Sequence, residues 1–306
     1  MPTRTKVLRQ LAPLLVLYMT MLVGCGAPTA SGSTSNVTGS GSAVSLPTGA
    51  ADPQGTLKLN GSSALLPLMQ LAADWYQAKH PGVYFVVAGS NSGAGRRLVC
   101  EGTIDLGTSD VPLTTAEQTK LNCSNAVQIP VAIQAFAPVA NQRGPGKLTS
   151  LTKAQLVDIF SGKVANWKDL GGDDQAIVLI NRVPGSGTRA NMTKYLFDGD
   201  DSKYATSILE DDNTAVEQAV RETPGALSYL GLAYLSNPAL RVLGIDNMSP
   251  TKETIQAGGW PIGGPGYAIT KGQPSALARD FLAFLTSPEF QNSDAFRRLG
   301  FVPLKQ

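Results

Sequence analysis

Short β-branched or apolar runs alternate with amphipathic stretches along most of the chain, and this alternation limits the fold more than any other feature of the sequence. The runs lie at residues 56–59, 83–87, 104–106, 126–131, 135–139, 177–180 and 267–269. Apolar side chains recur at helical spacing after the first run, up to His80, and again over 151–160 and 276–285. Strands separated by helices predict an α/β fold. The 306 residues are 42% hydrophobic, which is enough to bury a core.

The N-terminus has the features of an export signal. Three basic residues precede an apolar run over 11–23, which ends in Leu-Val-Gly before Cys25. This run is shorter than the roughly 20 apolar residues of a membrane-spanning helix. The pattern resembles the bacterial lipoprotein signal, so we expect residues 1–24 to be a signal peptide and Cys25 to be the lipidated first residue of the mature chain. The alternatives are a soluble secreted protein in which Cys25 is incidental, or an uncleaved anchor.

The net charge depends on this N-terminal segment. The full sequence has 25 basic and 23 acidic residues, a net charge of +2. Removing residues 1–24 takes away three bases and no acids, which leaves 22 bases against 23 acids and a net charge of −1. A basic surface for nucleic acid is therefore not expected. Residues 25–55, rich in Ser, Thr, Gly, Ala and Pro, are predicted to be a flexible tether, although a disordered segment without a role would have the same composition.

Two cysteines remain if Cys25 carries a lipid. Outside the cytoplasm, Cys100 and Cys123 are expected to form a disulfide, and two free buried thiols are the alternative. The sequence has no Cys-x-x-Cys pair and a single histidine, His80. No metal site and no cofactor are therefore expected.

Three glycine- and serine-rich turns lie where a predicted strand is followed by a helix, at 61–67, 89–95 and 182–188. Unpaired backbone N–H groups and the positive end of the macrodipole at a helix N-terminus bind anions, and serine adds a donor. Each turn alone is also typical of an ordinary serine-capped helix. None has the lysine of a phosphate loop, and a catalytic triad is not expected when His80 is the only histidine. An enzyme is therefore not predicted.

Together with four other segments, the turns resemble the substrate-binding proteins of high-affinity phosphate ABC transporters, in the periplasmic-binding-protein superfamily. These segments are 102–110, which ends in Ser-Asp, 151–167 with the sequence LTKAQLVDIFSGKVANW, 225–229, and 260–261. The resemblance implies an α/β, two-lobed type II periplasmic-binding-protein fold with two interdomain crossovers and a ligand cleft between the lobes. Carried onto this chain, lobe 1 covers 56–134 and 259–306, and lobe 2 covers 135–258.

The resemblance also implies a phosphate site made from the three turns and a carboxylate. Its residues would be Ser63, Ala64, Leu65, Leu66, Ser92, Asp110, Arg182, Ser186, Gly187 and Thr188. In the first turn the chain departs from the family, many members of which have threonine at or beside the positions of Ala64 and Leu65. The backbone donors survive this difference, whereas one hydroxyl contact is in doubt.

The chemistry of Asp110 and Arg182 indicates the same ligand. An ionised Asp110 only accepts hydrogen bonds, so it favours an oxyanion that still carries a proton, as phosphate does at neutral pH and sulfate does not. Arg182 supplies forked donors for an oxyanion. Without the other residues, a helix N-cap would be the simpler interpretation of Asp110, and a solvated surface charge that of Arg182.

The sequence thus predicts a monomeric receptor for inorganic phosphate, outside the cytoplasm and anchored to the cell membrane through lipidated Cys25. It would close its lobes on the anion and deliver it to the permease subunits of an ABC transporter, without binding nucleic acid and without chemistry of its own. The alternatives are a receptor for another oxyanion such as molybdate, tungstate or sulfate, a hydrolase of phosphate esters, or a surface protein for adhesion or sensing.

Overall fold

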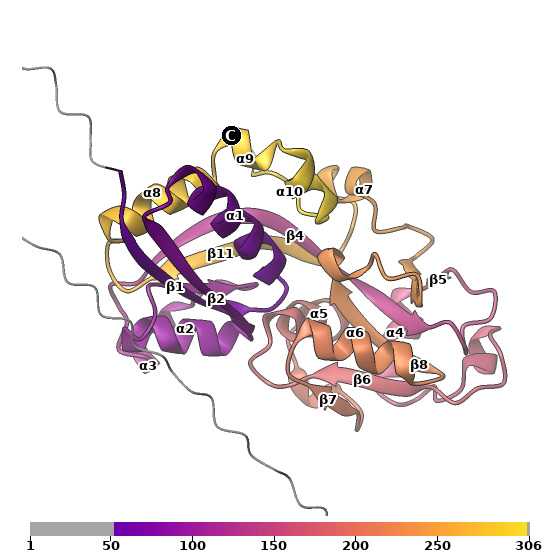
Figure 1. Ribbon diagram of the computed structural model, residues 1–306. Coiled ribbons are helices and arrows are strands. Elements are labelled where there is room, and N and C mark those ends of the chain that lie inside the picture. The colour runs from indigo at the N-terminus through magenta and orange to yellow at the C-terminus, as the bar shows by residue number, and fades with distance from the viewer. Residues whose placement is uncertain (1–51, 305–306) are drawn as a thin grey trace, which may run out of the picture. The chain divides into compact units, whose positions relative to one another are not determined.

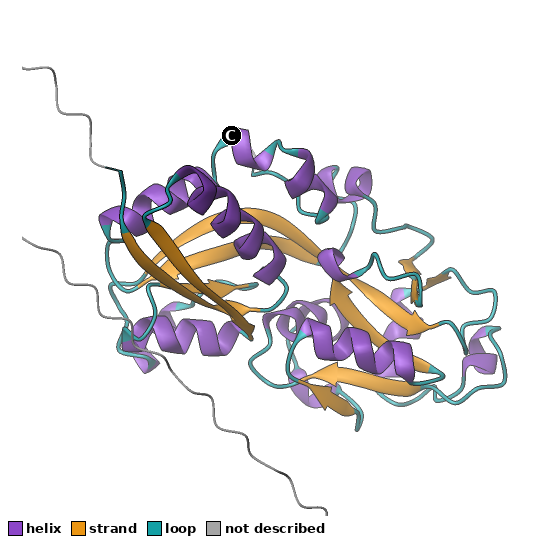
Figure 2. Cartoon of the chain, in the orientation of Figure 1, coloured by secondary structure: helices purple, strands orange, loops and turns teal. Residues whose placement is uncertain are grey.

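The computed structural model describes residues 52–304 (Figures 1 and 2). The predicted signal peptide, Cys25 and nearly all of the predicted tether lie outside this range. The strands are β1 (Gly55–Ser62), β2 (Val83–Ser90), β3 (Leu106–Ser109), β4 (Val127–Asn141), β5 (Ser150–Leu151), β6 (Val178–Arg182), β7 (Ile208–Glu210), β8 (Ala226–Gly231), β9 (Leu240–Val242), β10 (Gly244–Ile245) and β11 (Gly263–Thr270).

Helices follow most of these strands, as the alternating pattern predicts. They are α1 (Leu66–Lys79), α2 (Ser92–Glu101), α3 (Thr115–Lys120), α4 (Lys153–Phe160), α5 (Gly187–Phe197), α6 (Asn213–Glu222), α7 (Lys252–Gln256), α8 (Ala276–Leu285), α9 (Pro288–Gln291) and α10 (Asp294–Arg298). Short 3-10 helices lie at η1 (Trp167–Leu170), η2 (Asp201–Lys203) and η3 (Leu232–Tyr234). Within residues 52–304, no helix is long and apolar enough to cross a membrane.

Most strands join one sheet in the order β2-β1-β3-β11-β4-β8-β6-β7, with β9 also paired to β4, while β5 and β10 form a separate pair. The long strand β4 connects the two ends of this sheet (Figure 1). It pairs with β11 from Val127 to Ala135 and with β8 from Phe136 to Ala140. The two runs predicted at 126–131 and 135–139 are therefore a single strand.

Strand direction places two sets of carboxyl ends opposite each other. β1, β2 and β3 are parallel, and β11 is antiparallel to both β3 and β4. β8 is antiparallel to β4 and parallel to β6, which is parallel to β7. The first three strands therefore run in the direction of β4, and β6 and β7 run against it. In open α/β sheets, ligands bind at carboxyl ends of strands, so the space between these two sets is where a site is expected.

Two separate cores pack against the two ends of the sheet. One packs α1 and α8 against β1 and includes Leu68 and Phe281. The other packs α4 and α5 against β8 and includes Trp167. Along β4, Ala132 belongs to the first core and Ala135 to the second. The lobe boundaries at 134/135 and 258/259 stay a prediction.

The predicted disulfide between Cys100 and Cys123 is present. It joins the C-terminal end of α2 to the segment that follows α3, with the two Cα atoms 5.4 Å apart. Both half-cystines are buried beside Val99, Leu113 and Ile269. The crosslinked residues are 23 positions apart, and closing a loop of this length stabilises a folded chain by about 3 kcal/mol, mainly by restricting the unfolded state.

Candidate functional site

The three glycine- and serine-rich turns each connect a strand to a helix, as predicted: β1 to α1, β2 to α2 and β6 to α5. Asn91 caps α2 by accepting a hydrogen bond from the N–H of Ala94, and Ser186 caps α5 by accepting one from the N–H of Arg189. The ordinary capping role therefore applies to Ser186. Ser92 is different, because it is the first residue of α2, is fully buried and caps nothing.

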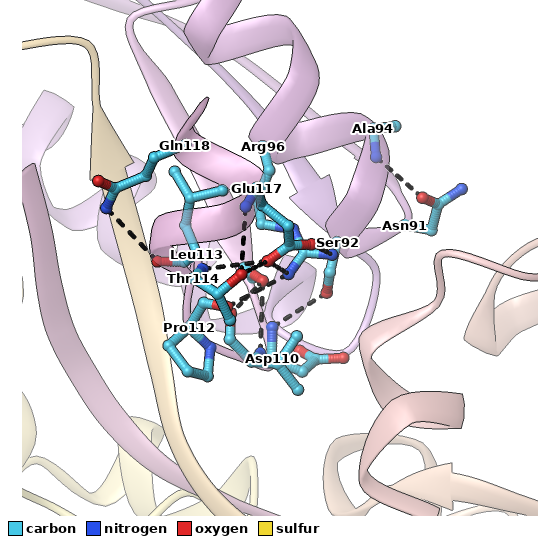
Figure 3. Close-up of polar contacts among 12 residues, drawn as sticks. Asn91, Ser92, Ala94, Arg96, Asp110, Pro112, Leu113, Thr114, Glu117 and Gln118 are labelled. Atoms are coloured by element: carbon cyan, nitrogen blue, oxygen red, sulfur yellow. Dashed lines mark hydrogen bonds and ion pairs between the residues drawn. The ribbon is translucent and has the colours of Figure 1, made fainter. Parts of the chain in front are cut away.

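Asp110 directly follows β3 and is only 5% exposed. Its Oδ1 accepts hydrogen bonds from Ser62 Oγ and from Gln134 Nε2, the latter at 3.1 Å, and its Oδ2 accepts one from Thr188 Oγ1 at 3.1 Å. The backbone N–H of Asp110 donates to Ser92 Oγ at 3.0 Å (Figure 3). A carboxylate has about four acceptor positions, so one position remains on Oδ2.

The segment after Asp110 is held by contacts between α2 and α3 (Figure 3). Arg96 of α2 forms an ion pair with Glu117 at 3.1 Å and donates to the carbonyl of Pro112 at 3.3 Å. Glu117 also completes a capping box with Thr114, which is the N-cap of α3. Asp110 is therefore not the cap of the following helix, and its carboxylate is available to the site.

Arg182, the last residue of β6, is 1% exposed, so it is not a surface charge. Its Nε donates to the carbonyl of Glu210 at 3.2 Å, and its Nη2 donates to the carbonyl of Asp211 at 2.7 Å. Nη2 also donates to Ser63 Oγ at 3.4 Å. Nη1 is buried and has no hydrogen-bond partner within residues 52–304. A buried donor left unpaired is costly, and an anion beside Nη1 would satisfy it.

The charges of Asp110 and Arg182 depend on each other. Burial raises the pKa of the Asp110 carboxyl above its ordinary value of 3.8, while three side-chain hydrogen bonds and the Arg182 charge act against this shift. Burial lowers the pKa of the Arg182 guanidinium, and the groups that oppose this include Tyr229 and Asp110. Each charge therefore offsets part of the cost of burying the other.

The first turn offers fewer free backbone donors than the resemblance implies. The N–H of Leu65 donates to Ser62 Oγ at 3.1 Å, and the N–H of Leu66 donates to the carbonyl of Ser63 at 3.3 Å. The N–H of Ala64 makes no hydrogen bond in the part of the chain that the structure describes. Ala64 N–H and the Ser63 hydroxyl are thus the donors of this turn that a ligand can use.

The third turn packs directly against the second turn and Asp110. A Cβ added to Gly187 would lie 2.7 Å from the Cβ of Asp110 and closer still to Oγ of Ser92. The N–H of Gly93 donates to the carbonyl of Gly185 at 2.9 Å. Only glycine at position 187 allows this approach, which brings the carboxyl ends of β2, β3 and β6 together.

The remaining donors define what the site can hold. In the described part of the chain, the N–H groups of Ala64, Gly187 and Thr188 and the Nη1 of Arg182 make no hydrogen bond. The acceptor position left on Asp110 lies beside Thr188, whose hydroxyl donates to the same carboxylate oxygen. Several donors around one acceptor suit a small oxyanion that carries a proton.

Sequence reasoning missed three residues of this region: Ser62, Gln134 and Asn213. The first two donate to Asp110, and Asn213 donates to Ser63. Gln134 is the single polar residue in the apolar segment 131–140, a signal that could have been used. Asn213 had no such signal, because Asp-Asp-Asn-Thr is typical of an ordinary helix start.

The family model that matches this chain describes a PBP superfamily domain and covers residues 46–289. The phosphate-binding protein PstS of Bacillus subtilis (strain 168) is 36% identical over 250 residues, which are 82% of this chain and 81% of that protein. The phosphate-binding protein PstS of Xylella fastidiosa (strain Temecula1) is 31% identical over 259 residues, 77% of this chain and 64% of that protein.

A solved structure gives the same result for the fold. It is of a Clostridium perfringens protein described as a phosphate ABC transporter substrate-binding protein, with bound phosphate. It is 23% identical, has a TM-score of 0.76, and the match covers 82% of this chain and all of that one. The fold is thus the α/β fold of periplasmic binding proteins, as predicted. The chain belongs to the PBP superfamily and, within it, to the family of the phosphate-binding proteins PstS.

Proposed function

We propose that the chain is an extracytoplasmic receptor for inorganic phosphate. The observation that carries the proposal is the pair of Arg182 Nη1, a buried donor without a partner within residues 52–304, and Asp110 Oδ2, a buried acceptor with one position left. Monohydrogen phosphate has charged oxygens for the arginine and a P–OH group for the carboxylate. The printed names of the Bacillus subtilis and Xylella fastidiosa relatives support the same ligand.

In the proposed site, donors from all three turns hold the phosphate oxygens. Arg182 Nη1 supplies the positive charge, and the N–H groups of Ala64, Gly187 and Thr188 supply main-chain donors. The hydroxyls of Ser63 and Ser92 add two more. Leu65, Leu66 and Ser186 contribute through the conformation of their turns, because their own groups already have partners.

Asp110 makes the site selective. Sulfate has no proton at neutral pH, so it would place an acceptor against the remaining acceptor position of a buried carboxylate. A receptor for molybdate, tungstate or sulfate is therefore the weaker candidate, since Asp110 would serve no purpose in it. A phosphate-ester hydrolase has less support, because His80 lies at the C-terminal end of α1, whose other end borders the site. We propose no chemistry for the protein.

Titration calorimetry of the purified protein tests this function. We expect phosphate to bind with a dissociation constant below about 1 µM, and sulfate to bind far more weakly. Equal affinities for the two anions would overturn the proposal, as would phosphate binding in the micromolar range or weaker. Release of phosphate from a simple ester by the same preparation would instead favour the hydrolase.

The proposal that the protein serves in transport rests on its family and not on the geometry of the site. We propose that two lobes, 56–134 with 259–306 and 135–258, close on the anion as a monomer and present it to the permease of an ABC transporter. Contacts such as Thr188 to Asp110 and Gly93 to Gly185 join the two proposed lobes directly. Closure would then couple ligand capture to the surface that the permease recognises.

Membrane attachment is a separate proposal, because Cys25 lies outside the described residues. The sequence pattern before Cys25 supports cleavage and lipidation at this residue. Mass spectrometry of the N-terminal peptide from producing cells should find an acylated Cys25, and Cys25→Ser should release the protein from the membrane fraction. An unmodified Cys25 in the mature protein, or an N-terminus at another residue, would contradict this proposal.

A further inference from the structure

The segment that joins β7 to α6 contacts both the arginine and the first turn of the site. The carbonyls of Glu210 and Asp211 accept hydrogen bonds from Arg182. Two residues later, Asn213 begins α6 and donates to Ser63 Oγ twice, from its backbone N–H at 3.1 Å and from Nδ2 at 2.8 Å. Ser63 and Asn213 are 150 residues apart in the sequence.

These two donors decide what the Ser63 hydroxyl can do. A hydroxyl has one hydrogen to donate and two lone pairs to accept with. Three donors converge on Ser63 Oγ, and the two at the shorter distances belong to Asn213, while Arg182 Nη2 donates at 3.4 Å. The Ser63 hydroxyl therefore directs its hydrogen away from Asn213, and toward a ligand it can act only as a donor.

The orientation of the Asn213 amide is itself fixed. Its Oδ1 accepts a hydrogen bond from the N–H of Gly231 at 3.3 Å, and the side chain is fully buried. Exchanging the amide oxygen and nitrogen would set donor against donor at Gly231 and would turn the Ser63 hydrogen toward Asn213. The first turn is also held by Tyr234, whose hydroxyl donates to the carbonyl of Ser63 at 2.7 Å. Asn213 is thus a donor to Ser63 in every arrangement that satisfies its neighbours.

We infer that Asn213 is a positioning residue for anion recognition, which makes Ser63 a donor to the ligand without touching the ligand itself. The inference rests on the proposed phosphate site. It also gives the first turn a hydroxyl contact that does not need the threonine of other family members, since Ser63 with Asn213 supplies the directed donor. A ligand that offers only donors at this position is rejected.

A double-mutant cycle between Asn213 and Ser63 tests the inference. We expect Ser63→Ala to weaken phosphate binding by about tenfold, the equivalent of one hydrogen bond, and Asn213→Ala to weaken it by up to about tenfold, since the backbone N–H of residue 213 remains. The double variant should bind no more weakly than Ser63→Ala alone, because Asn213 acts through Ser63. Losses that multiply in the double variant would overturn the inference.

A second substitution covers the case in which Asn213→Ala fails to fold. Asn213→Asp has nearly the same shape but replaces the Nδ2 donor by an acceptor, which would attract the Ser63 hydrogen. Its effect on phosphate affinity should be larger in the native background than in the Ser63→Ala background. Equal effects in both backgrounds would mean that Asn213→Asp weakens phosphate binding only through its added negative charge, and would contradict the inference.

Asn141→Ala is the matched control. Asn141 is also a buried asparagine that holds α6, but at its other end, where Nδ2 donates to the carbonyls of Val220 and Arg221 at 2.8 Å. We expect this variant to lose thermal stability as Asn213→Ala does and to keep native phosphate affinity. Equal losses of affinity in both variants would reduce Asn213 to a structural residue. Absence of phosphate binding by the native protein would instead refute the proposed function.

Discussion

Arg182→Lys is expected to weaken phosphate binding about 10- to 100-fold while leaving the fold intact. The positive charge remains, but an ammonium on a shorter side chain cannot bond the carbonyls of Glu210 and Asp211 and also reach the ligand position of Nη1. A charge-assisted hydrogen bond in a buried site contributes about 1.5–3 kcal/mol, and each 1.4 kcal/mol is about a tenfold change in affinity. Calorimetry with phosphate measures the loss directly.

Arg241→Lys is the control for this experiment. Arg241 also donates to backbone carbonyls, those of Gly146 at 2.7 Å and Leu148 at 3.4 Å, but it lies outside the site. We expect its phosphate affinity to equal that of the native protein. Comparable affinities of Arg182→Lys and Arg241→Lys would mean that Arg182 does not contact the anion, and the site would have to be placed elsewhere.

Asp110→Asn should reduce discrimination against sulfate by roughly 10–100-fold. An asparagine offers a donor where the carboxylate offered only acceptors, so sulfate no longer leaves a buried group unpaired, a cost of about 1–3 kcal/mol. Phosphate loses the acceptor for its P–OH group at the same time. Competition between phosphate and sulfate, measured by calorimetry, gives the ratio. Unchanged selectivity would remove Asp110 from the recognition mechanism.

Asp110→Asn is also expected to raise the stability of the protein without phosphate at neutral pH. The pKa of Asp110 is raised in the folded protein above its ordinary value of 3.8, chiefly by burial, so the folded state holds this proton more tightly than the unfolded chain does. The resulting stability is complete below the unfolded pKa and is lost as pH rises through the folded pKa. Without phosphate, Asp110→Asn should therefore melt at a higher temperature than the native protein at neutral pH, and the difference should shrink toward acid pH.

Asp105→Asn separates this effect from a general loss of negative charge. Asp105 precedes β3, at the end opposite Asp110, and its carboxylate accepts a hydrogen bond from the N–H of Lys58 at 2.8 Å. We expect no gain in melting temperature from this substitution. If Asp110→Asn is less stable than the native protein at neutral pH, the carboxylate is not destabilising and its burial has been compensated in full.

The sequence allowed elements with a clear period to be predicted, because their pattern is local. The predicted helix at 276–285 has the bounds of α8, and α1 ends at Lys79, with His80 as its C-cap. The strand β4 was predicted as two runs, 126–131 and 135–139, with polar Gln134 in the gap between them. The Gln134 amide donates a hydrogen bond to Asp110, which follows the end of β3. Nothing in the sequence near Gln134 indicates that partner.

The residues of the candidate site also fall into two groups, those with a local signal in the sequence and those without one. Residues within the three turns and in the Ser-Asp segment could be predicted, since helix starts and buried carboxylates follow from local composition and from the family resemblance. Residues that act on those side chains from a distance could not, because a hydrogen bond such as that of Asn213 to Ser63 depends on the packing of α6 against the first turn. The pairing of Cys100 with Cys123 was an exception, since these were the two cysteines left once Cys25 was predicted to carry a lipid.

The position of Gln134 on β4 has a mechanical consequence. This residue lies where the strand passes from one core to the other, and its amide touches Asp110. When two lobes rotate about a shared strand, atoms close to that strand move less than atoms far from it. In the proposed opening, Ser62 and Gln134 would keep their contacts with Asp110, because all three belong to proposed lobe 1, while the contact between Gly93 and Gly185, which joins the two proposed lobes, would separate. The Asp110 carboxylate would therefore be in position before the anion binds, and only the groups that enclose the anion would have to move.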